Sequence, residues 1–189
     1  MVTILNTGKT IYLIRHCEAY GQQAEALLTA KGKRQAHDLA DFLKDEGIQL
    51  ILSSTYLRAY ESAKPLAERL QITIQKEERL IERKLSSRNL NNWQSLLEKS
   101  FTDLDIVYED GESSRQAMKR ATDVMKECLQ RQEQRFAIVT HGNLLTLMWK
   151  YVDSTVGYIE WSKLSNPDVI QINYHLDRIA AKRIWEEDD

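Results

Sequence analysis

Two histidines in this chain directly follow short apolar runs that have the composition of buried β-strands. Residues 10–14 are followed by Arg15 and His16, and residues 136–140 are followed by His141. Unbroken runs of β-branched, leucine and aromatic side chains are typical of strands buried on both faces of a sheet. If the two strands are parallel neighbours, both histidines lie at the carboxyl edge of the sheet, where ligands bind in open α/β folds. A single histidine there would be interpreted as a structural residue, but the repetition favours a functional site.

Two arginines are placed to join these histidines. Arg15 comes just before the first of them. A third apolar run, residues 50–52, ends in Ser-Ser-Thr, and Arg58 lies near the start of the helix predicted to follow. Both guanidinium groups can therefore converge beside the imidazoles. Two arginines and two histidines, with helix N-termini nearby, make a strong receptor for a phosphate dianion.

The remaining pattern predicts the elements that would hold this site. Helices are expected after the N-cap Thr29, from Ser114, and over residues 144–151. Another is expected after residues 53–55, whose hydroxyl groups would cap it, with a kink or restart at Pro65. Further strands are expected at residues 72–74, 169–174 and 179–185, the last two as a hairpin. Strands that alternate with helices predict an α/β fold with a largely parallel sheet. The charged residues 76–113 interrupt this alternation and are interpreted as an insertion over the sheet, within a single domain of residues 1–189.

Composition narrows the class of protein. The chain has 189 residues, of which 42% are hydrophobic and 29% charged, as expected for a soluble globular protein. The formal charge of −2 and the lack of a long basic run argue against a nucleic-acid partner. No apolar stretch approaches the roughly 20 residues of a membrane span, and the first residues lack a secretory pattern. With only Cys17 and Cys128, no disulfide framework is expected, so the predicted location is the cytoplasm.

Five segments resemble, in order, the motifs of the histidine phosphatases, the phosphoglycerate mutase-like superfamily. Residues 13–18 are similar to Leu-x-Arg-His-Gly-Glu, residues 28–36 to Leu-Thr-x-x-Gly-x-x-Gln-Ala, and residues 53–63 to Ser-Ser-x-x-x-Arg-Ala-x-x-Thr-Ala. Gly-Glu-Ser at 111–113 and Val-Thr-His-Gly at 139–142 fit the two later motifs. The resemblance covers roughly residues 10–145. It implies a three-layer α/β/α sandwich around a mostly parallel sheet, and a phosphomonoesterase that needs no metal or other cofactor.

The resemblance also implies a role for each residue of the constellation. His16 would be the nucleophile that attacks phosphorus and forms a phosphohistidine, for which its ring must be neutral. Arg15, Arg58 and His141 would neutralise the phosphoryl oxygens, where charge accumulates during in-line transfer. A small-molecule phosphate ester is the expected partner.

A carboxylic acid must protonate the leaving oxygen and then activate water. Glu82 is the candidate, because Arg79-Leu80-Ile81-Glu82-Arg83 resembles the Leu-x-Glu segment that carries this role in the family. The alternative is a solvated glutamate in a charged stretch. Glu112 is the runner-up, although directly before a helix it more plausibly helps to cap that helix.

The loop after His16 departs from the family pattern at three positions. Cys17 stands where the family usually has glycine, and Ala19 and Gln22 replace a hydroxyl residue and an asparagine. These changes predict weaker phosphate contacts or an altered substrate. A thiol among arginine and histidine would have a lowered pKa and be sensitive to oxidation. The alternative is a buried, inert cysteine.

Other chemistries fit less well. A cysteine phosphatase needs an arginine six residues after the cysteine, and position 23 is Gln23. The four histidines (His16, His37, His141 and His175) show no close ligand spacing for a metal.

Two functional alternatives stay open. Phosphoglycerate mutase-type transfer is disfavoured because the cofactor-dependent mutases have longer chains, and a non-catalytic phosphate-binding regulator would need no acid. Arg83, Lys84 and Arg88 either line the leaving-group side of the site or form a solvated face. Aromatic residues near the C-terminal end (Trp149, Tyr158 and Trp161) could supply a homodimer interface.

Overall fold

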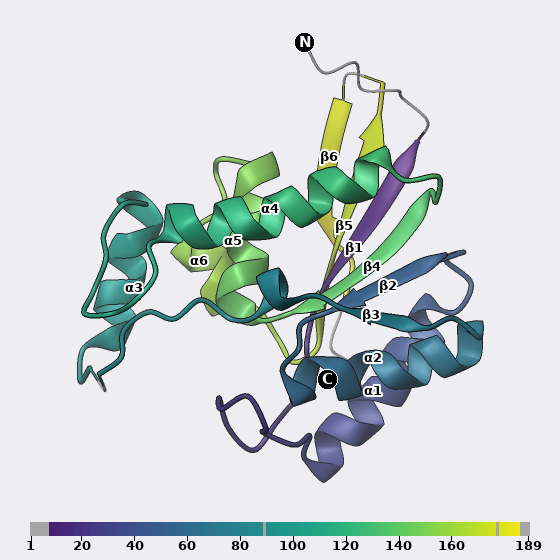
Figure 1. Cartoon of the computed structure of the whole chain (residues 1–189), viewed down its shortest axis with the longest axis horizontal. Helices are drawn as coiled ribbons and strands as arrows, with labels where there is room; N and C mark the ends of the chain where they lie inside the picture. Colours follow the sequence, from purple (N-terminus) through teal and green to yellow (C-terminus); the bar gives the residue numbers. More distant parts are fainter. Residues whose placement is uncertain (1–7, 89, 177, 186–189) are drawn as a thin grey trace.

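The computed structural model describes residues 8–88, 90–176 and 178–185, and within them one mixed sheet forms the centre (Figure 1). Its strand order is β3-β2-β4-β1-β5-β6. The strands are β1 (Lys9–Arg15), β2 (Leu50–Ser53), β3 (Ile74–Lys76), β4 (Arg135–Thr140), β5 (Asp168–His175) and β6 (Arg178–Arg183). Strands β1 to β4 are mutually parallel where they pair, whereas β5 runs antiparallel to β1 and β6 antiparallel to β5.

Helices cover both faces of this sheet. They are α1 (Ala30–Leu43), α2 (Leu57–Leu70), α3 (Trp93–Thr102), α4 (Ser114–Gln130), α5 (Gly142–Val152) and α6 (Tyr158–Ser162), with the 3₁₀ turn η1 (Glu78–Leu80). Helices α1 and α2 lie on one face, and α4 and α5 lie on the other (Figure 1). The predicted three-layer α/β/α architecture is confirmed. None of the helices in the described part of the chain is long and apolar enough to cross a membrane.

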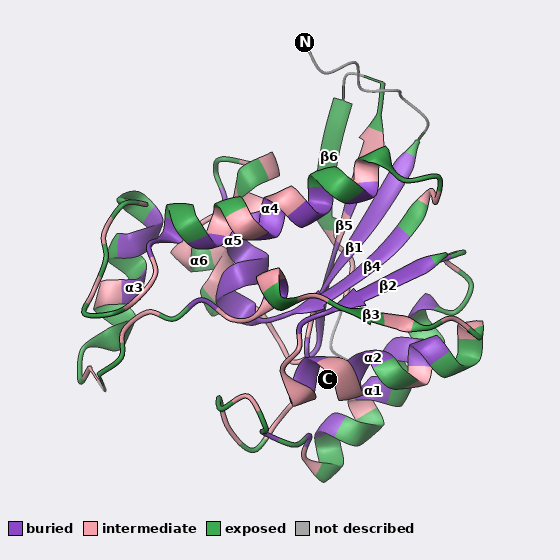
Figure 2. Cartoon of the chain, in the orientation of Figure 1, coloured by how far each residue is buried: buried purple, intermediate pink, exposed green. Residues whose placement is uncertain are grey.

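The unbroken apolar runs of the central strands follow from burial on both faces. In β1, Ile11 and Leu13 pack in the cluster beneath α4 and α5, whereas Tyr12 and Ile14 pack beneath α1 and α2. Strand β4 alternates in the same way. The central strands are therefore buried along their length, while the edge strand β6 is largely exposed (Figure 2).

Several local predictions need correction around α2. The helix runs through Pro65 from Leu57 to Leu70 in one piece, so no restart occurs there. Its N-cap is Tyr56 rather than one of the preceding hydroxyl residues. At the other end Gln71 adopts a left-handed conformation (φ 56°), and the N–H of Ile72 bonds back to Ala67. Residue 72 thus closes the helix, and β3 begins two residues later than predicted.

The segment between β3 and α4 contains η1 and α3, in the position of the predicted insertion. Helix α3 buries Leu97 and Phe101 in the cluster that includes α4 and α5. The Trp93 ring meets that of Trp161 in α6 edge to face, with centroids 6.0 Å apart. This segment therefore extends the α4–α5 layer at the end where α4 begins (Figure 1). Helix α6 itself was not predicted.

Candidate active site

The two histidines meet at the carboxyl edge of the sheet. Strands β1 and β4 are parallel neighbours with Arg15 opposite Thr140, so His16 and His141 are the next residue on each strand. The His16 N–H continues the ladder and donates to the Thr140 carbonyl at 3.0 Å. Both side chains are buried, and their ring centroids lie 5.2 Å apart.

Hydrogen bonds fix the proton of His16 on one ring nitrogen. Its Nδ1 lies 2.7 Å from the Cys17 carbonyl, which can only accept, so Nδ1 carries the hydrogen. The other nitrogen, Nε2, keeps its lone pair and accepts from Nε of Arg58 at 3.0 Å. Burial, aided by the charges of Arg58 and Arg15, lowers the pKa of His16 to about 3. The ring is therefore a neutral imidazole at physiological pH, with Nε2 as its basic atom.

Arg58 reaches His16 from the first turn of α2 and is fully buried. Its Nη1 donates to the carbonyls of Gln22 and Gln23, at 3.0 and 2.9 Å. The loop after His16 therefore holds the Arg58 guanidinium through backbone carbonyls. The Nη2 of Arg58 is buried and has no hydrogen-bond partner within the described residues.

Arg15 is held by a segment that sequence reasoning missed. Its Nη1 donates to the carbonyls of Leu164 and Ser165, at 2.8 and 3.2 Å, while its buried Nε has no partner in the described chain. The side chain of Asn166 in the same turn donates to the His16 carbonyl at 2.6 Å. This turn carries no periodic pattern or familiar motif, so the sequence contained no signal for it.

His141 presents a third buried donor. The Ser54 hydroxyl accepts from the Tyr56 N–H at 3.2 Å and lies 2.8 Å from Nε2 of His141. A hydroxyl has one hydrogen and two lone pairs. Nε2 of His141 is the acceptor that the described residues offer this hydrogen, so we assign the ring proton of His141 to Nδ1. That Nδ1 is buried and unpaired among the described residues. Burial, with His16 and Arg58 nearby, keeps the pKa of His141 well below its ordinary value.

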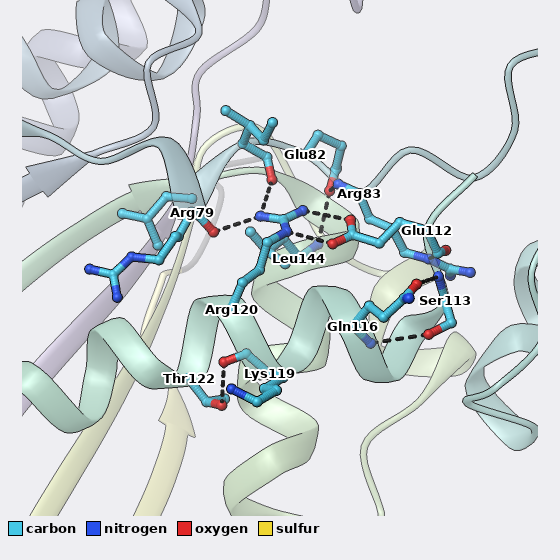
Figure 3. Close-up of polar contacts among 12 residues, drawn as sticks. Arg79, Glu82, Arg83, Glu112, Ser113, Gln116, Lys119, Arg120, Thr122 and Leu144 are labelled. Carbon is cyan, nitrogen blue, oxygen red and sulfur yellow. Dashed lines mark hydrogen bonds and ion pairs between the residues drawn. The ribbon is translucent and has the colours of Figure 1, made fainter. Parts of the chain in front are cut away.

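Glu82 lies against the helix that begins after His141. Its carboxylate accepts from the N–H groups of Leu144 and Arg83, both at 2.9 Å (Figure 3). It also accepts from the N–H of Asn143, which like Leu144 lies in the first turn of α5, at 3.1 Å. Its charge also opposes the lowering of the pKa that burial causes at both Arg15 and Arg58. Glu82 is therefore a bound carboxylate within electrostatic reach of both arginines, and the solvated alternative is wrong.

The chain before Glu82 is fastened at three successive carbonyls. The hydroxyl of Thr140, at the end of β4, donates to the Leu80 carbonyl at 2.7 Å. From α4, Nη1 of Arg120 donates to the carbonyls of Arg79 and Ile81, at 2.6 and 2.9 Å (Figure 3). Glu82 is the next residue along, so its backbone has little freedom to move.

Glu112 serves this same fastening rather than the roles predicted for it. Its two carboxylate oxygens accept from Nε and Nη2 of Arg120, at 2.7 and 2.8 Å. The cap of α4 is Ser113, whose side chain and that of Gln116 form a reciprocal capping box. Arg83 is buried and turns toward the Glu112 carbonyl and the Ser100 hydroxyl, so it does not form a solvated face.

The thiol of Cys17 points into the core rather than toward the arginines. It packs in the cluster beneath α1 and α2, and burial raises its pKa to about 12. The backbone N–H of Cys17 donates to the Ser62 hydroxyl at 2.8 Å. The expectation of a lowered pKa and oxidation sensitivity is wrong, and the alternative of a buried, inert cysteine fits the structure.

The chain is similar to known proteins in both sequence and fold. The model of the histidine phosphatase superfamily (branch 1) matches residues 11–187. An Escherichia fergusonii protein named "Probable phosphoglycerate mutase GpmB" is 28% identical over 186 aligned residues, covering 87% of this chain and 84% of that protein. A mycobacterial glucosyl-3-phosphoglycerate phosphatase superposes with a TM-score of 0.76 at 20% identity, covering 94% of this chain and 97% of that one. An Entamoeba histolytica phosphoserine phosphatase mutant, solved with phosphoserine, gives a TM-score of 0.74 at 19% identity, with 92% and 94% covered.

Proposed function

Because this chain belongs to the histidine phosphatase superfamily, we propose that it is a phosphomonoesterase that hydrolyses a small phosphate ester through a phosphohistidine at His16. One observation carries this proposal. A neutral imidazole, whose basic Nε2 accepts from Arg58, lies among three buried nitrogens (Nε of Arg15, Nη2 of Arg58 and Nδ1 of His141) that no described residue satisfies. Unpaired buried donors are costly, and a phosphoryl group supplies the acceptors that these donors lack.

The first step transfers the phosphoryl group to the protein. Phosphoryl oxygens that accept from Arg58 would replace its hydrogen bond to His16 and expose the Nε2 lone pair. Nε2 then forms a bond to phosphorus as the bond to the ester oxygen breaks in line. The positive charge that develops on the ring is stabilised by the Cys17 carbonyl, which already accepts from Nδ1. Arg15, Arg58 and His141 offset the negative charge on the equatorial oxygens.

The second step regenerates His16. Glu82 must take up a proton when the ester binds, from the substrate monoanion or from solvent. In the first step it gives this proton to the departing alkoxide, and the resulting carboxylate then takes a proton from water. That water attacks phosphorus, the bond to Nε2 breaks, and inorganic phosphate leaves. The contact of the Glu82 carboxylate with the first turn of α5, which follows His141 in the chain, supports this double role.

We further propose a small-molecule substrate and a cytoplasmic location. The site is built from short-range contacts among four buried or half-buried side chains, a scale that suits one phosphoryl group. Cys17 and Cys128 are both free and buried, which suits a reducing compartment.

Phosphate release from a panel of phosphorylated sugars, acids and alcohols, measured with a chelator present, tests the proposal. We expect the wild type to hydrolyse at least one ester that the His16→Ala variant does not hydrolyse. If the two proteins release phosphate at the same rate for every ester, the proposal is wrong. Interconversion of 2- and 3-phosphoglycerate without phosphate release would instead identify a mutase.

A further inference from the structure

Arg120 lies outside the constellation but holds the segment that ends in Glu82. Its side chain is only 20% exposed, and all three guanidinium nitrogens donate hydrogen bonds. Nη1 bonds the Arg79 and Ile81 carbonyls, while Nε and Nη2 bind Glu112 in a bidentate pair (Figure 3). The planar fork of arginine suits this double grip, because one edge binds the carboxylate and the remaining nitrogen reaches the carbonyls.

This grip acts on the acid directly. The Ile81 carbonyl belongs to the peptide bond that joins Ile81 to Glu82, so a shift of that carbonyl moves the Glu82 backbone. Arg120 is also near enough to the site for its charge to contribute to the lowered pKa of His141. Among the side-chain donors to these three carbonyls, Thr140 supplies a single neutral hydrogen bond to Leu80, which is weaker than the bonds from the charged Arg120.

We propose that Arg120 is a positioning residue for acid catalysis: through the backbone it keeps the Glu82 carboxyl where it can protonate the leaving oxygen. The proposal rests on the function assigned to Glu82 above. The salt bridge with Glu112 is part of this arrangement, because it fixes the direction in which the Arg120 guanidinium points.

Leaving groups distinguish positioning from general support of the fold. Expelling an alkoxide needs a proton, whereas p-nitrophenolate is stable enough to leave without one. Because general acid catalysis contributes about 10²- to 10⁴-fold, we expect Arg120→Met to lower kcat/KM for an alkyl phosphate by about tenfold or more. With p-nitrophenyl phosphate the expected loss is less than about threefold, since proton donation is not limiting there. Arg120→Lys, which keeps a donor for the carbonyls, should recover part of the lost activity.

Two controls make the outcome decisive. Arg115→Met removes an exposed arginine of the same helix that pairs with Asp105, and both substrates should be hydrolysed as by the wild type. Glu82→Gln should show the same leaving-group dependence as Arg120→Met, and adding Arg120→Met to Glu82→Gln should cost little more. If Glu82→Gln lacks this dependence, the acid assignment fails. If Glu82→Gln shows this dependence but Arg120→Met does not, because it slows hydrolysis of both substrates equally or of neither, the positioning proposal fails.

A variant that folds poorly would still leave the proposal testable. Glu112→Gln keeps the shape of the side chain but removes its charge, which loosens the guanidinium without emptying its place. It should give a smaller loss of the same selective kind, confined to the alkyl ester. An equal loss on both esters would again count against positioning.

Discussion

The two halves of the candidate site are held by different kinds of structure. The nucleophile half lies at the ends of β1 and β4, where the ladder itself places His16 beside His141. The acid half lies in irregular chain, where side chains from β4 and α4 grip three successive carbonyls before Glu82. A strand end is rigid because the whole sheet supports it, whereas an irregular segment is as rigid as its few anchors. We therefore expect substitutions in the nucleophile half to abolish hydrolysis of every ester. Substitutions in the acid half should instead slow only the esters whose leaving group needs a proton.

The largest effect is expected at the nucleophile. His16→Ala should lower kcat/KM by about a thousandfold or more for alkyl and aryl phosphates alike, because loss of a nucleophile removes the whole pathway. Initial rates of phosphate release for the two classes of ester measure this. A loss that depended strongly on the leaving group would contradict the expectation that the nucleophile half acts on all esters alike.

Arg58→Lys is expected to be the next largest. The variant keeps a positive charge but loses the fork that reaches Nε2 of His16 and the Gln22 and Gln23 carbonyls together. Removing one donor to a developing oxyanion costs about 10²- to 10³-fold in kcat, and a loss of that order is predicted for both ester classes. Arg69→Lys on the same helix, whose side chain pairs with Asp41 at the surface, is the matched control and should retain full activity.

A smaller effect, on stability, is expected at Gly32. A Cβ there would come within 2.0 Å of the Glu18 carbonyl oxygen, because the start of α1 packs against the loop that follows His16. Gly32→Ala should therefore lower the free energy of unfolding by about 1–3 kcal/mol, as overpacking does, and disturb the nucleophile half. Gly157→Ala has open space around the new methyl group and extended backbone, and should be nearly neutral. Urea unfolding of both variants checks the difference.

Acid should weaken the nucleophile half. His16 and His141 have lowered pKa values in the folded protein, so as pH falls below the ordinary histidine value the unfolded chain binds protons that the folded chain does not. Stability is therefore lost on acidification from about pH 6.5 downward, by at most about 1.4 kcal/mol per pH unit for each histidine. Urea midpoints between pH 7.5 and 4.5 should fall for the wild type and fall less steeply for His16→Asn. An unchanged slope would mean that His16 is not buried as a neutral ring.

The same division explains what the sequence could predict. The strand-end pattern and the order of the motifs predicted the α/β layers and the meeting of Arg15, His16, Arg58 and His141. A residue that directly follows a buried strand lies at its carboxyl end, and the carboxyl ends of parallel neighbours meet at one edge of the sheet. The contact between Arg120 and the Glu82 segment joins residues about 40 apart through backbone carbonyls, which have no sequence signature. The sequence likewise left open whether Cys17 is reactive or buried and inert, because its position in the core depends on how α1 and α2 pack around it.

Trapping the intermediate tests the phosphohistidine most directly. The protein is mixed with an ester that it hydrolyses, quenched in denaturant at high pH, and examined by intact-protein mass spectrometry and peptide mapping. A phosphoryl group should be found on His16, stable in base and lost in acid. With p-nitrophenyl phosphate, whose leaving group needs no acid, it should accumulate in Glu82→Gln, which lacks the base for the second step, and it should be absent from His16→Ala. Steady hydrolysis with no phosphoryl group on His16, or with one on Cys17 or Glu82 instead, would contradict the mechanism.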